Sequence, residues 1–306
     1  MMYFGKSFFV LGATFIHDAH ALRMEPFEKG DCSNESNNEE VVLLLCGAFS
    51  PITVNHIDQV AEVYKFFQNN ENGIQVAEAV LSPVHDGYGK KGLLNSRHRV
   101  AMANAACGDW NESNPSGLTV RVSSWEADQP NYLDTIDVIR HVKQDVQPAG
   151  KSVLYTCGAD QFITMFELNS DGTPKWPSDQ VAEILDGRVV VIARDEYADR
   201  LDLMNVLETL VKEAPVPGYS TVDRIMAKVI FVPSNLKELS STVVRRAFVA
   251  DEPVTEFVFP SVAQYMDANR NEFKTLWRHI EHQPSQSLQK ASKKQVRRVG
   301  VSQSAQ

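Results

Sequence analysis

The chain has 306 residues, of which 43% are hydrophobic and 23% are charged, as in an ordinary globular protein whose core needs no disulfide or metal to hold it. Its net charge is -9, although residues 271–306 alone carry seven Lys or Arg and two Asp or Glu. The acidic remainder lacks the positive charge that phosphate backbones require, so we expect no nucleic-acid partner.

The first 40 residues are predicted to lie outside the folded domain. An apolar run over residues 7–16 is too short to cross a membrane, and no other segment is predicted to do so. The run could be a weak signal or transit peptide, but an extension or a wrongly assigned start codon is favoured because a cleavage site is missing. Residues 30–40 are polar and turn-rich, which is typical of a linker.

Apolar runs then alternate with helical patterns along the chain. Strands are predicted at residues 41–46, 75–84, 118–123, 152–157, 188–193 and 228–232. Helices are predicted at residues 56–67, 96–106, 133–146, 160–168, 179–185, 201–212, 240–250 and 261–273. This order predicts the α/β class, with a Rossmann-like, doubly wound parallel sheet in one domain over residues 41–273 that has a helical C-terminal part. Residues 274–306 are predicted to form a basic, disordered tail.

The chain has four cysteines, and none of them forms a C-x-x-C pair or has a spacing typical of zinc ligands. Two of them, Cys46 and Cys157, lie in apolar runs that are typical of buried strands. We therefore expect reduced thiols in the core and no metal ligands in the protein.

Ligands of such a sheet bind beyond the carboxyl ends of its strands. The segment GAFSPITVNH, residues 47–56, follows the first predicted strand. Gly47 would let the backbone approach a phosphate, and Thr53 and His56 would lie on one side of a helix start, whose partial positive charge suits an anion. Taken alone, the segment could also be a tight turn with a capping histidine. It matches neither a Walker A loop nor G-x-G-x-x-G, which disfavours P-loop nucleoside triphosphatases and dehydrogenases.

A second segment, SSTVVRR at residues 240–246, opens a predicted helix with hydroxyl side chains. Such residues are ordinary helix caps. Arg245, three residues after Thr242, would add a guanidinium beside the free backbone N–H groups and hydroxyls. That combination is suited to clamping a polyphosphate.

The pattern Gly-x-Phe-x-Pro-x-Thr-x-x-His, followed by a distant Ser-Ser-Thr-x-x-Arg, resembles the nucleotidylyltransferase superfamily. Within it, the chain is similar to the eukaryotic-type nicotinamide/nicotinate mononucleotide adenylyltransferases over residues 41–273. The other segments that carry this resemblance occur in the family's order and at similar spacing: SPV (82–84), Asp86, Tyr88, KKGL (90–93), HRV (98–100), WE (125–126) and CGAD (157–160).

The resemblance implies a role for each matching residue. It implies that His56, Lys90 and Arg245 are catalytic, as groups that neutralise phosphate charge. It assigns the ATP or NAD contacts to Gly47, Ala48, Phe49, Thr53, Gly158, Asp160, Arg194, Ser241 and Thr242. It assigns the mononucleotide contacts to Tyr88, Tyr132, Thr135 and Trp176, with Tyr132 and Trp176 on either side of the pyridine ring. Mg²⁺ would be carried on the ATP phosphates.

Some positions depart from the family's pattern. Ala48 stands where a serine is common, Gly89 where a lysine is common, and Tyr132 where the family usually has tryptophan. Lys237 and Glu238 replace a polar pair. These changes bear on affinity and base preference more than on the class of reaction.

The expected function is therefore synthesis of NAD or deamido-NAD from ATP and nicotinamide or nicotinate mononucleotide, by in-line attack on the α-phosphorus. The alternatives are another nucleotidylyltransferase, acting for example on phosphopantetheine or FMN, or a non-catalytic nucleotide-binding or chaperone-like protein. The resemblance also implies a homo-oligomer. A cytoplasmic or nuclear location is expected, and the basic cluster at residues 293–298 is either a nuclear import signal or a solvated tail.

Overall fold

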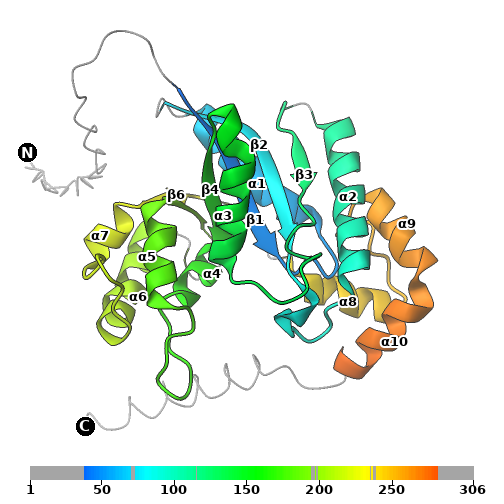
Figure 1. The fold of residues 1–306 in the computed structure, drawn as a ribbon. Coiled ribbons are helices and arrows are strands. Elements are labelled where there is room, and N and C mark those ends of the chain that lie inside the picture. Colours follow the sequence, from blue (N-terminus) through cyan, green and yellow to red (C-terminus); the bar gives the residue numbers. More distant parts are fainter. Residues whose placement is uncertain are drawn as a thin grey trace, which may run out of the picture. The chain divides into compact units, whose positions relative to one another are not determined.

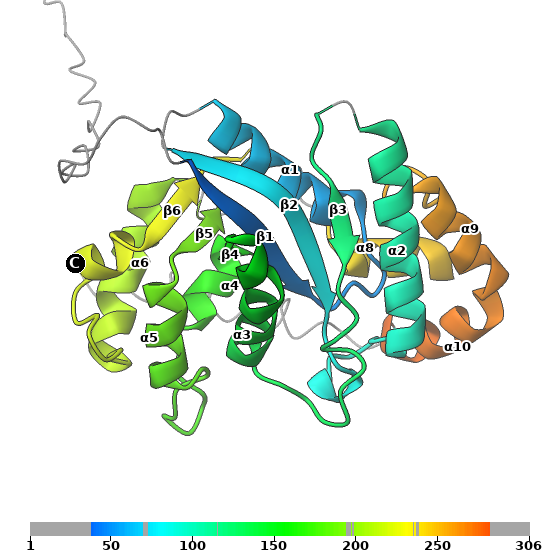
Figure 2. The same ribbon diagram turned by 45° about the horizontal axis from the view of Figure 1, so that its top comes forward.

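A computed structural model describes residues 38–69, 73–114, 116–193, 197, 199–234, 236 and 239–281. Its centre is a sheet of six strands: β1 (Glu39–Gly47), β2 (Ile74–Pro83), β3 (Val120–Val122), β4 (Ser152–Gly158), β5 (Val189–Ile192) and β6 (Val229–Val232). The strands run in the order β3-β2-β1-β4-β5-β6, and every neighbouring pair is parallel (Figures 1 and 2). The predicted Rossmann-like, doubly wound α/β fold is confirmed.

Side chains of β1 alternate between two cores because successive residues of a strand point to opposite faces. Val41, Leu43 and Leu45 belong to one buried cluster, whereas Val42 and Leu44 belong to the other. Both faces of the strand are therefore covered, which explains why its sequence is continuously apolar and not alternating.

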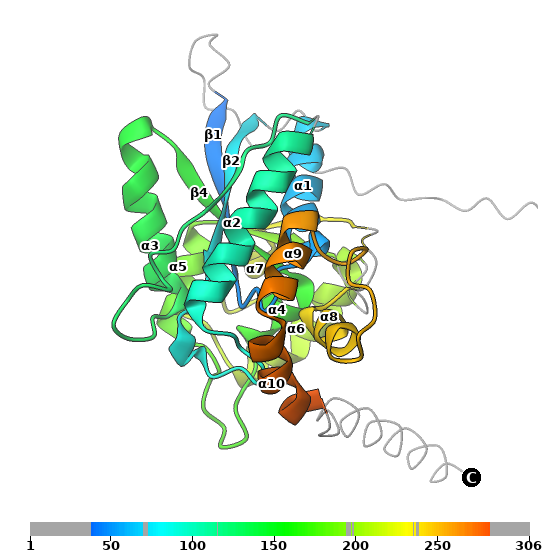
Figure 3. The ribbon, with the colours of Figure 1, turned by 90° about the vertical axis from the view of Figure 1, so that its right-hand side faces the viewer.

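Helices divide between the two faces, as Figure 3 shows for α1, α2 and α9 on one side of the strands and α3 and α5 on the other. The first layer holds α1 (Val54–Gln68), α2 (Ser96–Ser113), α8 (Ser241–Val249), α9 (Pro260–Ala268) and α10 (Arg270–Glu281). The second layer holds α3 (Thr135–Val146), α4 (Ala159–Thr164), α5 (Ser178–Asp186), α6 (Arg200–Glu213) and α7 (Val222–Met226). Two 3₁₀ turns, η1 (Asp86–Tyr88) and η2 (Gln147–Ala149), complete the described elements.

Three predicted helices differ from the structure by more than two residues at one end or in number. The helix predicted at residues 96–106 continues to Ser113, because Cys107 is buried and Asn111 bonds both backbone groups of Val120. The helix predicted at residues 160–168 ends at Thr164, and a short hairpin follows. The helix predicted at residues 261–273 is two helices separated at Asn269.

The last described helix, α10, packs into the main core. Trp277 is fully buried against Phe248 and Phe273, and its indole N–H donates to the carbonyl of Gly92 at 3.0 Å. The end of the domain predicted at residue 273 therefore falls inside α10, whose helical structure runs to Glu281.

Replacing Trp277 by Ala is expected to lower the free energy of unfolding by about 3–5 kcal/mol, the usual cost of deleting a buried aromatic side chain. Trp277→Phe keeps most of the apolar volume but loses the bond to Gly92, so it should cost less. Chemical denaturation measures both values. An unfolding free energy for Trp277→Ala equal to that of the wild type would show that α10 does not contribute to the core.

No helix among the described residues is both long and apolar enough to cross a membrane. The prediction of a disordered tail over residues 274–306 is wrong for residues 274–281, which belong to α10. The leader, the linker up to residue 37, residues 282–306, Arg194, Lys237 and Glu238 lie outside the described residues, so the predictions made for them stay predictions.

Candidate active site

A cavity of about 650 Å³ opens at the carboxyl ends of β1 and β4. The chain leaves β1 for β2 on one side and returns through β4 on the other, so this is the point where the strand order reverses. Ten residues with predicted roles line the cavity: Gly47, Ala48, His56, Tyr88, Lys90, Tyr132, Thr135, Gly158, Asp160 and Trp176. Segments that are far apart in the sequence thus meet in one place.

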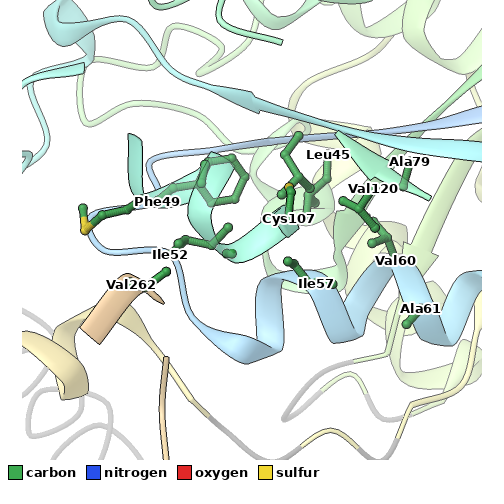
Figure 4. Close-up of a cluster of buried hydrophobic side chains, with 14 of the residues drawn as sticks. Leu45, Phe49, Ile52, Ile57, Val60, Ala61, Ala79, Cys107, Val120 and Val262 are labelled. Carbon is green, nitrogen blue, oxygen red and sulfur yellow. The ribbon is translucent and has the colours of Figure 1, made fainter. Parts of the chain in front are cut away.

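The loop after β1 is anchored by Phe49 and Ile52, whose fully buried side chains point into the hydrophobic cluster around α1 and α2 (Figure 4). A Cβ atom at Gly47 would lie 2.7 Å from the ring of Phe49, so only glycine leaves room for that ring. Phe49 itself has a φ of 43°, in the left-handed region that β-carbons disfavour. The loop backbone is therefore held along the cavity wall by core packing beneath it.

His56 lies in the first turn of α1, where its orientation is set by Thr53. The backbone N–H of Thr53 donates to Nδ1 of His56 at 2.9 Å, and the Thr53 hydroxyl lies 2.8 Å from the same nitrogen. Because Nδ1 accepts the backbone N–H, the proton of the neutral ring is on Nε2. The ring of Phe49 packs edge-on against the imidazole at a centroid distance of 5.1 Å. His56 thus lines the cavity with a defined tautomer.

A buried arginine fixes the next loop, which carries Tyr88 and Lys90. The fully buried guanidinium of Arg99 donates to the carbonyls of Leu94 and Ala48 and to the carboxylate of Asp86, the last at 2.7 Å. Burial lowers the pKa of Arg99, and the Asp86 carboxylate opposes that shift. The arginine of the HRV segment therefore has a structural role, since it joins the loop after β1 to the loop after β2.

Aromatic side chains lie on the cavity wall. Tyr88 and Tyr132 stack on each other with centroids 6.2 Å apart and an angle of 21° between the rings, and both are about half exposed. Trp176 comes from another part of the chain, after the hairpin in which Leu168 pairs with Pro174. Its indole N–H donates to the hydroxyl of Thr164 at 3.2 Å. A flat ring bound in this cavity would have aromatic side chains from separate segments available for stacking.

The end of β4 supplies Gly158 and Asp160. Gly158 has extended backbone and is the N-cap of α4, and Asp160 lies exposed in the first turn of that helix. Nearby, the side-chain amide of Gln161 donates to the phenol of Tyr155 at 3.0 Å. This edge of the cavity offers a carboxylate and backbone groups, which are suited to ribose hydroxyls.

The segment at residues 240–246 is hydrogen-bonded to the segment at residues 47–56. Arg245 donates from one guanidinium nitrogen to the carbonyl of Ser50 at 2.9 Å and from another to the hydroxyl of Thr242 at 3.0 Å. The hydroxyl of Ser241 donates to the carbonyl of Pro51 at 2.8 Å. The start of α8 is thus bonded directly to the loop that precedes His56, although 190 or more residues separate the bonded pairs.

Some predicted residues do not line the cavity. Phe49 and Thr53 are buried. Ser241 and Arg245 donate to the backbone of the loop after β1, and Thr242 accepts from Arg245, but none of the three lines the cavity. Arg194 lies outside the described residues. The phosphate contacts expected of α8 therefore stay predictions, whereas its contact with the loop after β1 is observed.

Several cavity residues had no predicted role. They are Cys46, Gln59, Glu126, Asp134, Gln161, Thr164, Asn169, Lys175 and Gln180, together with apolar neighbours. The side chain of Gln180 donates to Asp134 at 2.8 Å, and Lys175 pairs with Glu167 across the hairpin. Apart from Glu126, which belongs to the WE segment, no local motif marks these positions. Only the fold brings them to the site.

Glu126 is the most unusual of these groups. It is 3% exposed and accepts a bond of 2.7 Å from the hydroxyl of Ser82. Burial raises the pKa of its carboxyl to about 7, and the bond from Ser82, the charge of Arg99 and the backbone N–H of His85 oppose that rise. A carboxyl that titrates near neutrality on a cavity wall is a recognised mark of a functional site.

The described cysteines are free thiols, as expected. Cys46, Cys107 and Cys157 are all buried, and burial raises the pKa of each thiol. Among the described residues, no three His, Cys, Asp or Glu side chains are grouped to hold a metal ion.

Comparison with known proteins identifies relatives of this chain. The profile of the cytidylyltransferase-like family matches residues 44–247. Nicotinamide/nicotinic acid mononucleotide adenylyltransferase 1 of Bos taurus is 37% identical over 112 residues, which cover 37% of each chain. Nicotinamide/nicotinic acid mononucleotide adenylyltransferase of Arabidopsis thaliana is 33% identical over 184 residues, which cover 57% of this chain and 70% of the relative.

Other matches are shorter or more distant. The first curated relatives are matched over about a third of their own length, as with the type 2 adenylyltransferase of Xenopus tropicalis, matched over 32%. Among solved structures, Plasmodium falciparum nicotinic acid mononucleotide adenylyltransferase complexed with NaAD is similar with a TM-score of 0.50 at 16% identity, over 77% of this chain and 98% of the other. That likeness concerns the fold.

Proposed function

This chain belongs to the cytidylyltransferase-like family, as a nucleotidylyltransferase of the nicotinamide/nicotinic acid mononucleotide adenylyltransferase group, and on that premise we propose that it makes NAD or deamido-NAD. Its substrates would be ATP and nicotinamide or nicotinate mononucleotide, with pyrophosphate as the second product. The observation that carries the proposal is that His56 and Lys90 line the same cavity as the aromatic residues Tyr132 and Trp176.

In the proposed reaction, an oxygen of the mononucleotide's 5′-phosphate attacks the α-phosphorus of ATP. A new P–O bond forms there, and the bond between the α-phosphorus and the oxygen that bridges to the β-phosphorus breaks. Pyrophosphate leaves with that electron pair, so no covalent intermediate on the protein is needed. Catalysis of this kind depends mainly on positioning and on neutralising charge.

Residues of the cavity suit these tasks. His56 would donate its Nε2 proton to a phosphate oxygen as charge moves toward the leaving group, because Nδ1 is occupied by the Thr53 N–H. Lys90 would add a positive charge from the loop that follows β2. Asp160 and the backbone around Gly158 would contact the adenosine ribose. In this arrangement the adenosine end of the dinucleotide would lie at the end of β4, and the pyridine ring would lie beside Tyr132 and Trp176.

Mg²⁺ fits this site as an ion carried by ATP. The described residues group no three metal-ligating side chains, and Mg²⁺ commonly keeps its waters and binds through substrate phosphates. When bound there, it would supply further neutralisation of the triphosphate charge.

A steady-state assay with ATP and each mononucleotide in parallel tests the proposal. The expected result is formation of NAD, deamido-NAD or both, with one pyrophosphate for each dinucleotide. Purified, folded protein that makes neither dinucleotide would contradict it. Turnover with phosphopantetheine or FMN in place of the pyridine mononucleotides would assign the chain to a different adenylyltransferase.

Replacing Trp176 by Ala is expected to raise the KM for the mononucleotide about tenfold, since stacking of a base on an aromatic side chain contributes about 1–3 kcal/mol. Trp176→Phe should retain most of the affinity. The KM for ATP should change little in both variants, because the indole follows the hairpin and belongs to neither segment proposed to bind phosphate. Equal rises in both KM values would instead indicate a general disturbance of the hairpin.

A further inference from the structure

We propose that Glu126 is a specificity-determining residue, which favours the acid mononucleotide when its carboxyl is neutral and the amidated mononucleotide when it is ionised. The proposal rests on the function proposed above. It concerns a choice that the motifs of the sequence leave open, namely which of two substrates that differ in one pyridine substituent is preferred.

The position of the carboxyl is the first step. Glu126 follows β3 and lines the cavity beside Tyr88 and Tyr132, the aromatic pair near which a pyridine ring would stack. Its side chain is buried and is held by the hydroxyl of Ser82 and the backbone N–H of His85. A substrate in the cavity would therefore meet a carboxyl of fixed position with little water around it.

The charge of this carboxyl changes near neutral pH. Its pKa is raised to about 7, first by burial, so the side chain is neutral below that pH and anionic above it. Arg99 on α2 is the cation facing it, but that guanidinium is bonded to the carboxylate of Asp86. Of the other groups that face it, Cys46 on β1, Tyr155 on β4 and Tyr132 stay neutral, because burial raises the pKa of each.

Other charged or titratable side chains share the cavity. They are His56, Tyr88, Lys90, Asp134, Asp160 and Lys175. A charge that is constant between pH 6 and pH 8.5 changes the ratio of the two kcat/KM values by the same factor at every pH, so it does not make that ratio depend on pH. The His56 imidazole is distinguished from Glu126 by the variants described below.

The two substrates differ by one negative charge. Nicotinate mononucleotide carries a carboxylate on its ring, whereas nicotinamide mononucleotide carries a neutral amide. Their phosphates are identical, so the ionisation of the phosphate cancels in the ratio of the two kcat/KM values. What remains is the interaction of the extra carboxylate with the cavity, and an ionised Glu126 repels that carboxylate.

The test is competition between the two mononucleotides, with ATP saturating, at several pH values between 6 and 8.5. For the wild type, the ratio of kcat/KM for acid over amide is expected to fall about fivefold as pH rises through this range, as for two charges that interact across a partly solvated site. Glu126→Gln, which keeps an acceptor for Ser82, should hold the ratio at the low-pH value throughout.

Two further variants separate the effect of the Glu126 charge on the acid-over-amide ratio from unspecific effects of substitution. Ser82→Ala removes a bond that lowers the pKa of Glu126, so the midpoint of the wild-type transition should move to higher pH. Asp128→Asn removes a carboxylate from the same turn at an exposed position, where it accepts from Ser124, and should leave the profile unchanged. Ser82→Ala also keeps the test decisive if Glu126→Gln does not fold.

The outcomes are distinct. A wild-type ratio that does not vary with pH, or a slope that persists in Glu126→Gln, would overturn this inference and leave the proposed function intact. Failure to form either dinucleotide would instead contradict the proposed function itself.

Discussion

His56→Ala is expected to lower turnover by about two or more decades, the scale observed when one donor to a transition state is lost. The donor to the transition state is the Nε2–H group, because Nδ1 already accepts the N–H of Thr53. The fold should remain, since the imidazole lies on the cavity and the sheet does not depend on it. Steady-state turnover and far-ultraviolet circular dichroism measure the two properties.

A pair of substitutions separates the two nitrogens of the ring. His56→Asn places a polar atom near the position of Nδ1 and should preserve the interaction with Thr53. His56→Gln places an amide nitrogen near the position of Nε2 and should recover part of the turnover. The alanine variant should lose about 1 kcal/mol of stability, which is typical for removal of a helix cap. Wild-type turnover in a folded His56→Ala protein would remove this residue from the mechanism.

The sheet was predictable because its strands are buried on both faces. The continuous apolar run at β1 and the strong run at β5 need two covering layers, and the alternation with helices leaves few topologies. The order of the strands within the sheet is a different matter. It depends on which crossover packs on which face, and no local pattern encodes that choice.

Cavity residues carried by motifs were predictable, whereas those brought in by packing were not. Gly47 and His56 belong to one short pattern, so their proximity follows from the sequence. Glu126 is only one of many acidic residues until burial and the Ser82 hydroxyl single it out. Lys175 reaches the cavity through a hairpin, in a stretch where the sequence predicts neither a helix nor a strand.

Arg245 shows a different limit of prediction from sequence: a motif can identify a residue without identifying its contacts. The sequence pattern predicts that its guanidinium binds the triphosphate directly. In the structure Arg245 is 5% exposed and donates to the carbonyl of Ser50 and to the hydroxyl of Thr242. A hydroxyl-rich helix start followed by arginine is compatible with either use, because a guanidinium carries five N–H donors.

Arg245→Met is therefore expected to have two effects. It should lower the free energy of unfolding by about 2 kcal/mol, because the buried carbonyl of Ser50 loses its donor. It should also lower turnover by about two decades, because the loop that leads to His56 loses its attachment to α8 and the site loses a positive charge. Urea denaturation and steady-state kinetics measure the two effects separately.

Arg245→Lys and Thr242→Val distinguish the attachment from the charge. Lysine keeps the charge, but its single ammonium cannot hold Ser50 and Thr242 in the planar fork that Arg245 provides. If the attachment dominates, Arg245→Lys should resemble Arg245→Met, and both KM values should rise together. If the guanidinium also binds the triphosphate, Arg245→Met should raise the KM for ATP more than that for the mononucleotide.

Thr242→Val leaves the bond to Ser50 in place, so it should retain most of the stability. An Arg245→Met protein with wild-type stability and turnover would contradict both roles. Neither stability nor catalysis would then depend on the contact between α8 and the loop after β1.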